Sequence, residues 1–119
     1  MIAAARAVVG GFKLAGSASA GGVGAALRTK SGKIFTGICT DFDSSIGFCA
    51  EHAAVAEMLK TRETAILAIV AVTEDSILPP CGRCRELLAQ LDKSNRATWV
   101  IVKEGTSVTL EQLLPYRFQ

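Results

Sequence analysis

Two short cysteine motifs constrain this chain more than any other feature of its sequence. The first is Cys49-Ala50-Glu51, and the second is Pro80-Cys81-Gly82-Arg83-Cys84, with 31 residues between Cys49 and Cys81. Three thiolates can hold one zinc ion whose fourth coordination position is left to water. A fold that uses the motifs in this way must bring the starts of the segments 49–60 and 81–91 side by side.

Length and composition predict one compact domain over residues 1–119. The chain has 119 residues, half of them apolar and only 20% charged, which excludes a disordered chain. The formal net charge is +2, and the charges are interspersed rather than clustered. We therefore expect a small-molecule substrate and no nucleic-acid polymer as the partner.

The apolar segments do not predict a membrane span or an exported protein. The longest apolar run, 65–72, is too short to cross a bilayer. The Ala-rich N-terminus is interrupted by Arg6 and Lys13, so it is expected to be a helix rather than a signal peptide. A cytoplasmic location follows as an expectation, with the four cysteines as thiols or metal ligands rather than disulfides.

The order of predicted elements indicates an α/β protein. We expect helices over 1–15, with an interruption at Gly10-Gly11, and over 49–60, 81–91 and 110–114. Strands are expected over 23–29, 33–39, 66–72 and 98–102, with loops over 17–22 and 40–48 and a hairpin turn over 30–32. The continuous apolar run 66–72 is typical of a central strand that is buried on both faces. The predicted fold is a three-layer α/β/α sandwich with a mixed central sheet.

The cysteines and Glu51 suit a catalytic metal centre. Both cysteine segments open predicted helices, whose N-terminal N–H groups stabilise thiolates. Glu51 follows Cys49 by two residues, which can place its carboxylate beside the metal as a general acid/base rather than as a ligand. Three thiolates overcompensate the charge of Zn²⁺, so a nearby donor should withdraw charge from sulfur; Arg83 is the best candidate, and His52 is another.

Several other interpretations of the same residues stay open at this point. The Cys81–Cys84 pair alone would suit a redox dithiol. With Cys39 as a fourth ligand, the site would be a closed structural zinc in a non-catalytic module. Glu51 could also be a solvated helix charge, and we expect Glu57 and Glu63 to be surface charges. His52 could be a ligand, although packing or hydrogen bonding is the commoner use of a single histidine.

The motifs resemble those of the cytidine deaminase family, in particular its small tetrameric branch with three cysteine ligands, which includes the blasticidin-S deaminases. The similarity runs from about Val23 to Phe118 and also includes the strand-like segments 23–27 and 33–37, the segment 46–51 that ends in Cys49-Ala50-Glu51, and the C-terminal segment 113–118. It implies a cytidine deaminase-like fold, a homotetramer or homodimer, and a Zn²⁺ cofactor held by Cys49, Cys81 and Cys84.

The resemblance also implies roles for single residues. Glu51 would shuttle protons, and Phe118 would close the active site of its own or a neighbouring subunit. Substrate contacts would fall on Cys39, Asp41, Ala50 and Phe118. Arg83 matches the blasticidin-S deaminase form of the motif, whereas His52 occupies the place of an arginine in many cytidine deaminases.

The departures from the family pattern concern the substrate. Gly21 occupies the position of an aromatic residue that packs on the pyrimidine, and Cys39 and Asp41 replace an Asn-x-Glu pair that holds the ribose. Cys39 cannot make the hydrogen bonds of an amide. The expected reaction is the hydrolytic deamination of a cytidine-type nucleoside or related aminated heterocycle, with release of ammonia. A blasticidin-S-like compound or a free base is the alternative substrate.

Overall fold

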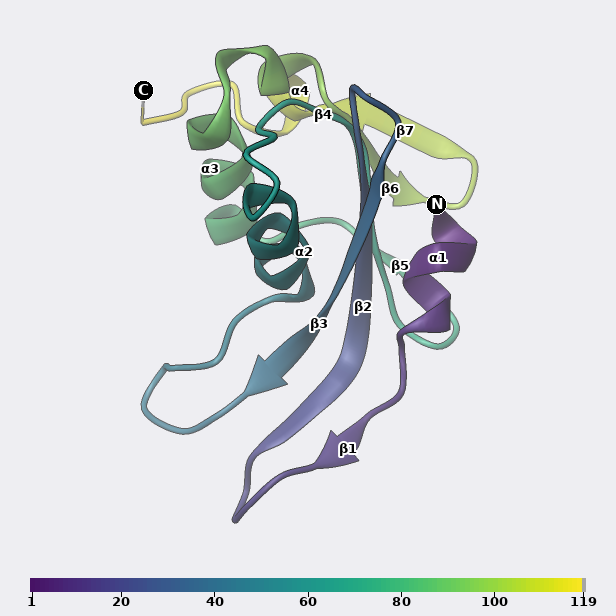
Figure 1. Cartoon of the computed structure of the whole chain (residues 1–119), viewed down its shortest axis with the longest axis vertical. Helices are drawn as coiled ribbons and strands as arrows, with labels where there is room; N and C mark the ends of the chain where they lie inside the picture. Colours follow the sequence, from purple (N-terminus) through teal and green to yellow (C-terminus); the bar gives the residue numbers. More distant parts are fainter. Residues whose placement is uncertain (119) are drawn as a thin grey trace.

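The computed structural model describes residues 1–118 and contains a seven-stranded mixed sheet with helices on both faces (Figure 1). The strands are β1 (Phe12–Lys13), β2 (Ser19–Thr29), β3 (Ile34–Asp41), β4 (Ile66–Val72), β5 (Ile77–Leu78), β6 (Trp99–Lys103) and β7 (Thr106–Thr109). The helices are α1 (Ile2–Ala7), α2 (Ala50–Leu59), α3 (Gly82–Leu91) and α4 (Leu110–Leu113), with a 3₁₀ turn η1 (Lys93–Ala97).

Strand β4 holds the centre of the sheet, as its uninterrupted run of Ile, Val and Ala predicts. It pairs antiparallel with β2 on one side and parallel with β6 on the other. Strand β3 is antiparallel to the other side of β2 and forms an edge of the sheet. The one parallel pair among antiparallel pairs makes the sheet mixed, which confirms the prediction.

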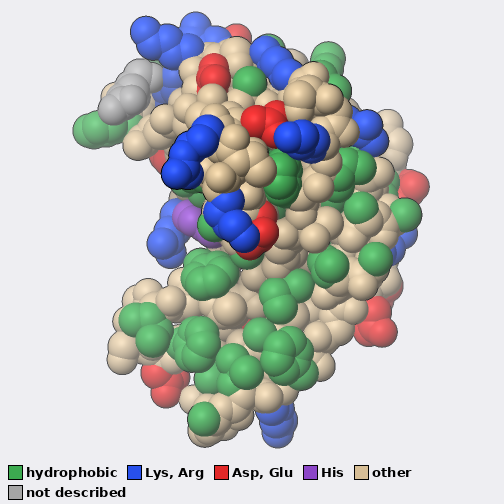
Figure 2. All heavy atoms as spheres, in the orientation of Figure 1, with side chains coloured by type: hydrophobic (Ala, Val, Ile, Leu, Met, Phe, Trp, Pro, Cys, Tyr) green, Lys and Arg blue, Asp and Glu red, His purple; other side chains and the backbone are tan. Residues whose placement is uncertain are grey.

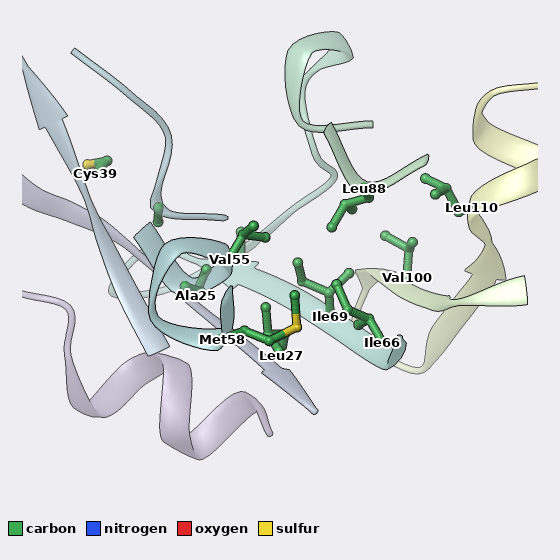
Figure 3. Close-up of a cluster of buried hydrophobic side chains, with 13 residues drawn as sticks. Ala25, Leu27, Cys39, Val55, Met58, Ile66, Ile69, Leu88, Val100 and Leu110 are labelled. Carbon is green, nitrogen blue, oxygen red and sulfur yellow. The ribbon is translucent and has the colours of Figure 1, made fainter. Parts of the chain in front are cut away.

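Two hydrophobic clusters lie on opposite faces of this sheet and define three layers. The larger cluster packs α2 and α3 against the sheet and contains Leu27, Met58, Ile69 and Leu88 (Figure 3). The smaller cluster packs α1 against β2 and β4 through Ala5 and its neighbours. The predicted α/β/α sandwich is therefore confirmed. None of the helices within residues 1–118 has the length and apolar character needed to cross a membrane.

Helix α2 lies very close to the edge strand β3. A Cβ atom on Gly37 would sit 2.4 Å from the backbone nitrogen of Ala54 and 2.6 Å from the backbone oxygen of Ala50. Only a glycine permits this approach, because real Cβ atoms do not come so near to backbone atoms. The contact brings the C-terminal end of β3 next to the N-terminus of α2, where Cys49 lies.

The N-terminal part of the chain differs from the prediction. The expected helix over 1–15 ends at Ala7, and residues 12–13 form β1 instead. The glycines at 10 and 11 end the helical segment, because glycine favours the unfolded backbone over a helix interior. The expected loop over 17–22 was also wrong, since β2 begins at Ser19 and its irregular pairing between Ala20 and Gly24 bends it around this region.

The prediction missed β5, η1 and β7, three short elements that tertiary contacts stabilise. Asn95 in η1 shows how. Its buried amide accepts a hydrogen bond from the Ile66 N–H at 2.9 Å and donates to the carbonyls of Thr64 and Leu88 at 3.0 and 3.1 Å. These bonds connect α3, η1 and the start of β4, and no local sequence pattern predicts them.

Candidate active site

A pocket of about 540 Å³ lies where the ends of β3 and β4 meet the N-termini of α2 and α3. Residues from both cysteine motifs line it, among them Cys49, Glu51, Cys81 and Arg83. The loop between β3 and α2 supplies a further wall, and this loop projects from the body of the molecule in Figure 1. The pocket therefore gathers segments that are far apart in the chain.

The three motif cysteines form one cluster, in which Cys49 and Cys81 line this pocket and Cys84 is buried beside them. Cys49 and Cys81 are the N-cap residues of α2 and α3, and neither uses its side chain to cap its helix. The Cys81 sulfur lies 3.4 Å from the sulfurs of Cys49 and Cys84, and all three sulfurs lie within 4.8 Å of one another. These spacings are far above the ~2.05 Å of a disulfide. They approach the ~3.8 Å expected between thiolates around a tetrahedral zinc with Zn–S bonds of about 2.3 Å, so the cluster fits that ion.

The protein environment treats the three thiols differently. Burial raises the pKa of Cys49, and burial together with the nearby Glu51 carboxylate raises the pKa of Cys84. Burial also opposes ionisation of Cys81, but the backbone N–H of Cys84 and the Cys49 side chain outweigh it and lower the Cys81 pKa. A divalent cation supplies the positive charge that would favour all three as thiolates.

Glu51 lies in the first turn of α2 and lines the same pocket. Glu51 is only 5% exposed, and this burial raises the pKa of its carboxyl group. A buried carboxylate with no cationic partner is costly in a structural role. Its burial and its place in the pocket lining do not fit a solvated helix charge.

The two candidate donors to the sulfurs lie in different settings. Arg83 lines the pocket, while His52 does not. Burial lowers the pKa of His52, and the neighbouring Arg83 charge lowers it further. The Nε2 atom of His52 is buried and has no hydrogen-bond partner among the described residues. In Figure 2 the histidine, in purple, is visible beside basic side chains above a hollow in the surface.

Cys39 lies outside the sulfur cluster but within the pocket wall. The group of metal-ligating atoms found within residues 1–118 comprises the sulfurs of Cys49, Cys81 and Cys84. The Cys39 sulfur instead accepts a hydrogen bond from the Val23 N–H at 3.3 Å. This arrangement does not favour a four-cysteine structural zinc. Asp41 and Ala50 line the same pocket, and their contact with a substrate stays a prediction.

Phe118 lies away from this pocket in the single chain. Its side chain is 84% exposed, and its backbone N–H donates to Oε1 of Glu86 at 3.2 Å. A role in closing a neighbouring subunit's site stays a prediction.

Two aromatic residues of the pocket were missed by the sequence analysis. Phe42 and Phe48 both line it, from the loop predicted over 40–48. Thr40 and Phe48 exchange backbone hydrogen bonds of 3.0 and 3.1 Å, which closes the base of this loop. The occurrence of two phenylalanines in the segment leading to Cys49 was the available signal, because aromatic side chains are frequent in small-molecule sites. Figure 2 shows hydrophobic side chains, in green, gathered over the lower half of the face in view.

Comparison with known proteins agrees with this geometry. The family described as the cytidine and deoxycytidylate deaminase zinc-binding region matches residues 4–101. A cytidine deaminase from Halalkalibacterium halodurans is 32% identical over 102 residues, which cover 81% of this chain and 76% of the relative. A blasticidin-S deaminase from Bacillus cereus is 30% identical over 108 residues, with the same coverage of 81% and 76%.

Solved structures extend the likeness to the whole fold. The crystal structure of cytidine deaminase from Mycobacterium tuberculosis aligns with a TM-score of 0.79 and 29% identity, covering 97% of this chain and 91% of that one. Cytidine deaminase from Burkholderia pseudomallei aligns with a TM-score of 0.69 and 30% identity, covering 81% of this chain and 80% of that one. With a family match over most of its length and a cysteine cluster that fits the family's metal, this chain belongs to the cytidine deaminase family of zinc-dependent hydrolytic deaminases.

Proposed function

We propose that this protein deaminates an amino-substituted pyrimidine, either as a nucleoside or as a related heterocycle, and releases ammonia. The observation that carries the proposal is the position of Glu51. Glu51 is buried and lines the same pocket as Cys49 and Cys81, whose sulfurs cluster with that of Cys84. A structural zinc site has no use for such a group, whereas hydrolysis needs a proton carrier beside the metal.

Cys49, Cys81 and Cys84 would hold the zinc. When bound, zinc supplies a Lewis acid that activates water at neutral pH. Glu51 takes a proton from the attacking water and delivers it to the ring nitrogen beside the amino-bearing carbon. It then takes the remaining proton from the hydroxyl group that the water has added to this carbon and transfers it to the departing amino group, which leaves as ammonia.

Arg83 and the two helix N-termini would reduce the excess negative charge of three thiolates. The backbone N–H groups of Cys84 and Arg83 already favour the Cys81 thiolate and lower the pKa of that thiol. The guanidinium of Arg83 adds a full positive charge at the pocket wall. His52 is the second candidate, since its buried Nε2 has no other partner among residues 1–118.

The substrate would meet a largely apolar wall. Gly21, at the position where related enzymes have an aromatic residue that packs on the pyrimidine, does not line the pocket. Phe42 and Phe48 line it and offer aromatic surface in its place. Asp41 offers a carboxylate for a sugar hydroxyl, and Cys39 offers no strong donor. The backbone of Ala50, between Cys49 and Glu51, would provide a further polar contact for the substrate. A blasticidin-S-like nucleoside is the second candidate, because a blasticidin-S deaminase is among the relatives and Arg83 adds a cation at the pocket wall.

Ammonia release tests this proposal across cytidine, deoxycytidine, cytosine, blasticidin S and purine analogues. We expect cytidine and cytosine to differ little in kcat/KM, or a bulkier nucleoside to exceed both. The reason is that a site without strong sugar donors discriminates weakly for the sugar. Efficient turnover of cytidine with cytosine inert would show instead that other residues, such as Asp43 or Ser44, hold the ribose. Absence of ammonia from every compound would count against deamination itself.

The assembly and location follow from the family alone. We expect a homo-oligomer, a tetramer or dimer, in which Phe118 of one subunit closes the pocket of another, and a cytoplasmic location. Light scattering of the purified protein measures the assembly directly, and a stable, active monomer would contradict it.

A further inference from the structure

We propose that the outer edge of β3 is an interface between two copies of this chain, which join through antiparallel β3–β3 pairing about a two-fold axis at Thr36. The proposal assigns a surface that the pocket does not include, since Ile34, Thr36 and Ile38 lie outside the pocket lining. It rests on strand geometry and not on the reaction proposed above; of the residues used below, Asp41 at the end of β3 also lines the pocket.

The backbone of β3 leaves a regular row of unpaired groups on its outer side. The Thr29 N–H donates to the Lys33 carbonyl at 2.8 Å, so these two residues form a hydrogen-bonded pair of the β2–β3 ladder. Such pairs alternate along antiparallel strands, and the register Leu27↔Phe35 and Ala25↔Gly37 continues the series. The N–H and C=O groups of Ile34, Thr36 and Ile38 therefore point away from β2.

The end of this free edge is marked by Phe48. Thr40 is the next residue with outward groups, and it exchanges hydrogen bonds of 3.0 and 3.1 Å with Phe48. This observation confirms the alternation independently. The free stretch thus runs from Ile34 to Ile38, between the turn at 30–32 and the Thr40–Phe48 bridge.

This stretch lacks the features that usually protect an edge strand. Residues 34–38 are Ile, Phe, Thr, Gly and Ile, with no proline and no charge, and their pairing to β2 contains no bulge. A groove of about 480 Å³ runs along the edge, lined by these five residues together with Ala53 and Glu57 of α2. An uncharged, regular edge of this kind favours the addition of another strand.

A second copy of β3 satisfies this edge completely. With Thr36 opposite its own symmetry mate, Ile34 of each copy lies opposite Ile38 of the other. All the outward N–H and C=O groups of the three residues then pair reciprocally, as an isologous interface requires. On the face opposite α2, the side chains form β-branched cross-strand pairs, which stabilise sheets.

The charges at the two ends of the strand are also complementary in this register. Lys33 precedes the free stretch and Asp41 ends β3, and both lie on the same face by strand alternation. Antiparallel pairing about Thr36 places each Lys33 diagonally across from the partner's Asp41, within reach of a long side chain. Lys33 now pairs with Glu63 at 3.6 Å at an exposed position, which leaves it free to exchange partners.

A charge-pair test distinguishes self-pairing from any other occupant. Ile34→Lys alone should raise the dissociation constant between copies by about tenfold or more, because it places a lysine against Ile38 twice in each dimer. The double variant Ile34→Lys/Ile38→Glu should restore association, since each lysine then faces a glutamate of the partner. Sedimentation equilibrium measures both, with far-UV circular dichroism and zinc content as controls that the chains are folded.

Hydrogen exchange of the unmodified protein provides a second measurement. The Thr36 N–H should become protected as the concentration rises, while the Phe35 N–H, which bonds to β2, stays protected at all concentrations. Three results would overturn the proposal: a wild-type chain that stays monomeric, an association that Ile34→Lys leaves unchanged, or a double variant as weak as the single one. Failure of deamination would affect none of these readouts.

Discussion

Replacing Glu51 by glutamine should reduce kcat by about 10²- to 10⁴-fold, the range that general acid/base catalysis typically contributes. Glutamine has nearly the shape of glutamate, but its amide cannot accept a proton from water. Because glutamine fills nearly the same space and Glu51 lies outside the sulfur cluster, the variant should keep its fold and its zinc. The measurement is steady-state ammonia release, together with zinc analysis of the same preparation.

Glu111→Gln is the matched control for this variant. Glu111 also lies in the first turn of a helix, α4, but it is exposed and outside the pocket. It should keep the wild-type rate. If Glu51→Gln stays within about tenfold of the wild-type kcat while carrying zinc, Glu51 is not the proton carrier.

Replacing Cys81 by alanine should abolish stable zinc binding. The wild-type chain should carry about one zinc, and loss of one of three thiolates removes a ligand that the remaining two cannot replace. Cys81 is exposed, so the substitution leaves no cavity in the core. Metal analysis after dialysis measures the zinc content directly.

Cys39→Ala separates the open site from a closed four-cysteine site. Its sulfur lines the pocket but lies outside the cluster of the other three. We expect Cys39→Ala to keep its zinc with a changed KM, because the substitution alters the pocket wall and not the metal ligands. A Cys39→Ala protein that loses zinc as fully as Cys81→Ala would contradict a three-cysteine site.

The metal centre could be predicted from the sequence because its chemistry is local. The spacing in Cys81-Gly82-Arg83-Cys84 places two sulfurs within one helical turn, and the structure places the Cys49 sulfur 3.4 Å from Cys81. The central position of β4 could also be predicted from the sequence, since a strand buried on both faces must be apolar throughout. These features depend on few residues and on strong physical requirements.

The N-terminus and the loop before α2 could not be predicted in the same way. Residues 1–15 have helical composition, yet pairing of Phe12 with Ala20 makes a strand there. The loop over 40–48 is polar on average, but Phe42 and Phe48 line the pocket. Both outcomes depend on long-range contacts, which override local propensity.

Zinc-dependent ammonia release tests the central claim most directly. The purified wild-type protein would be stripped of metal with a chelator, assayed on the best substrate of the panel, and assayed again after one equivalent of zinc is added. The predicted result is loss of ammonia release with the metal and its return with zinc, in wild-type protein but not in Cys81→Ala. Undiminished ammonia release by the metal-free protein would contradict the claim.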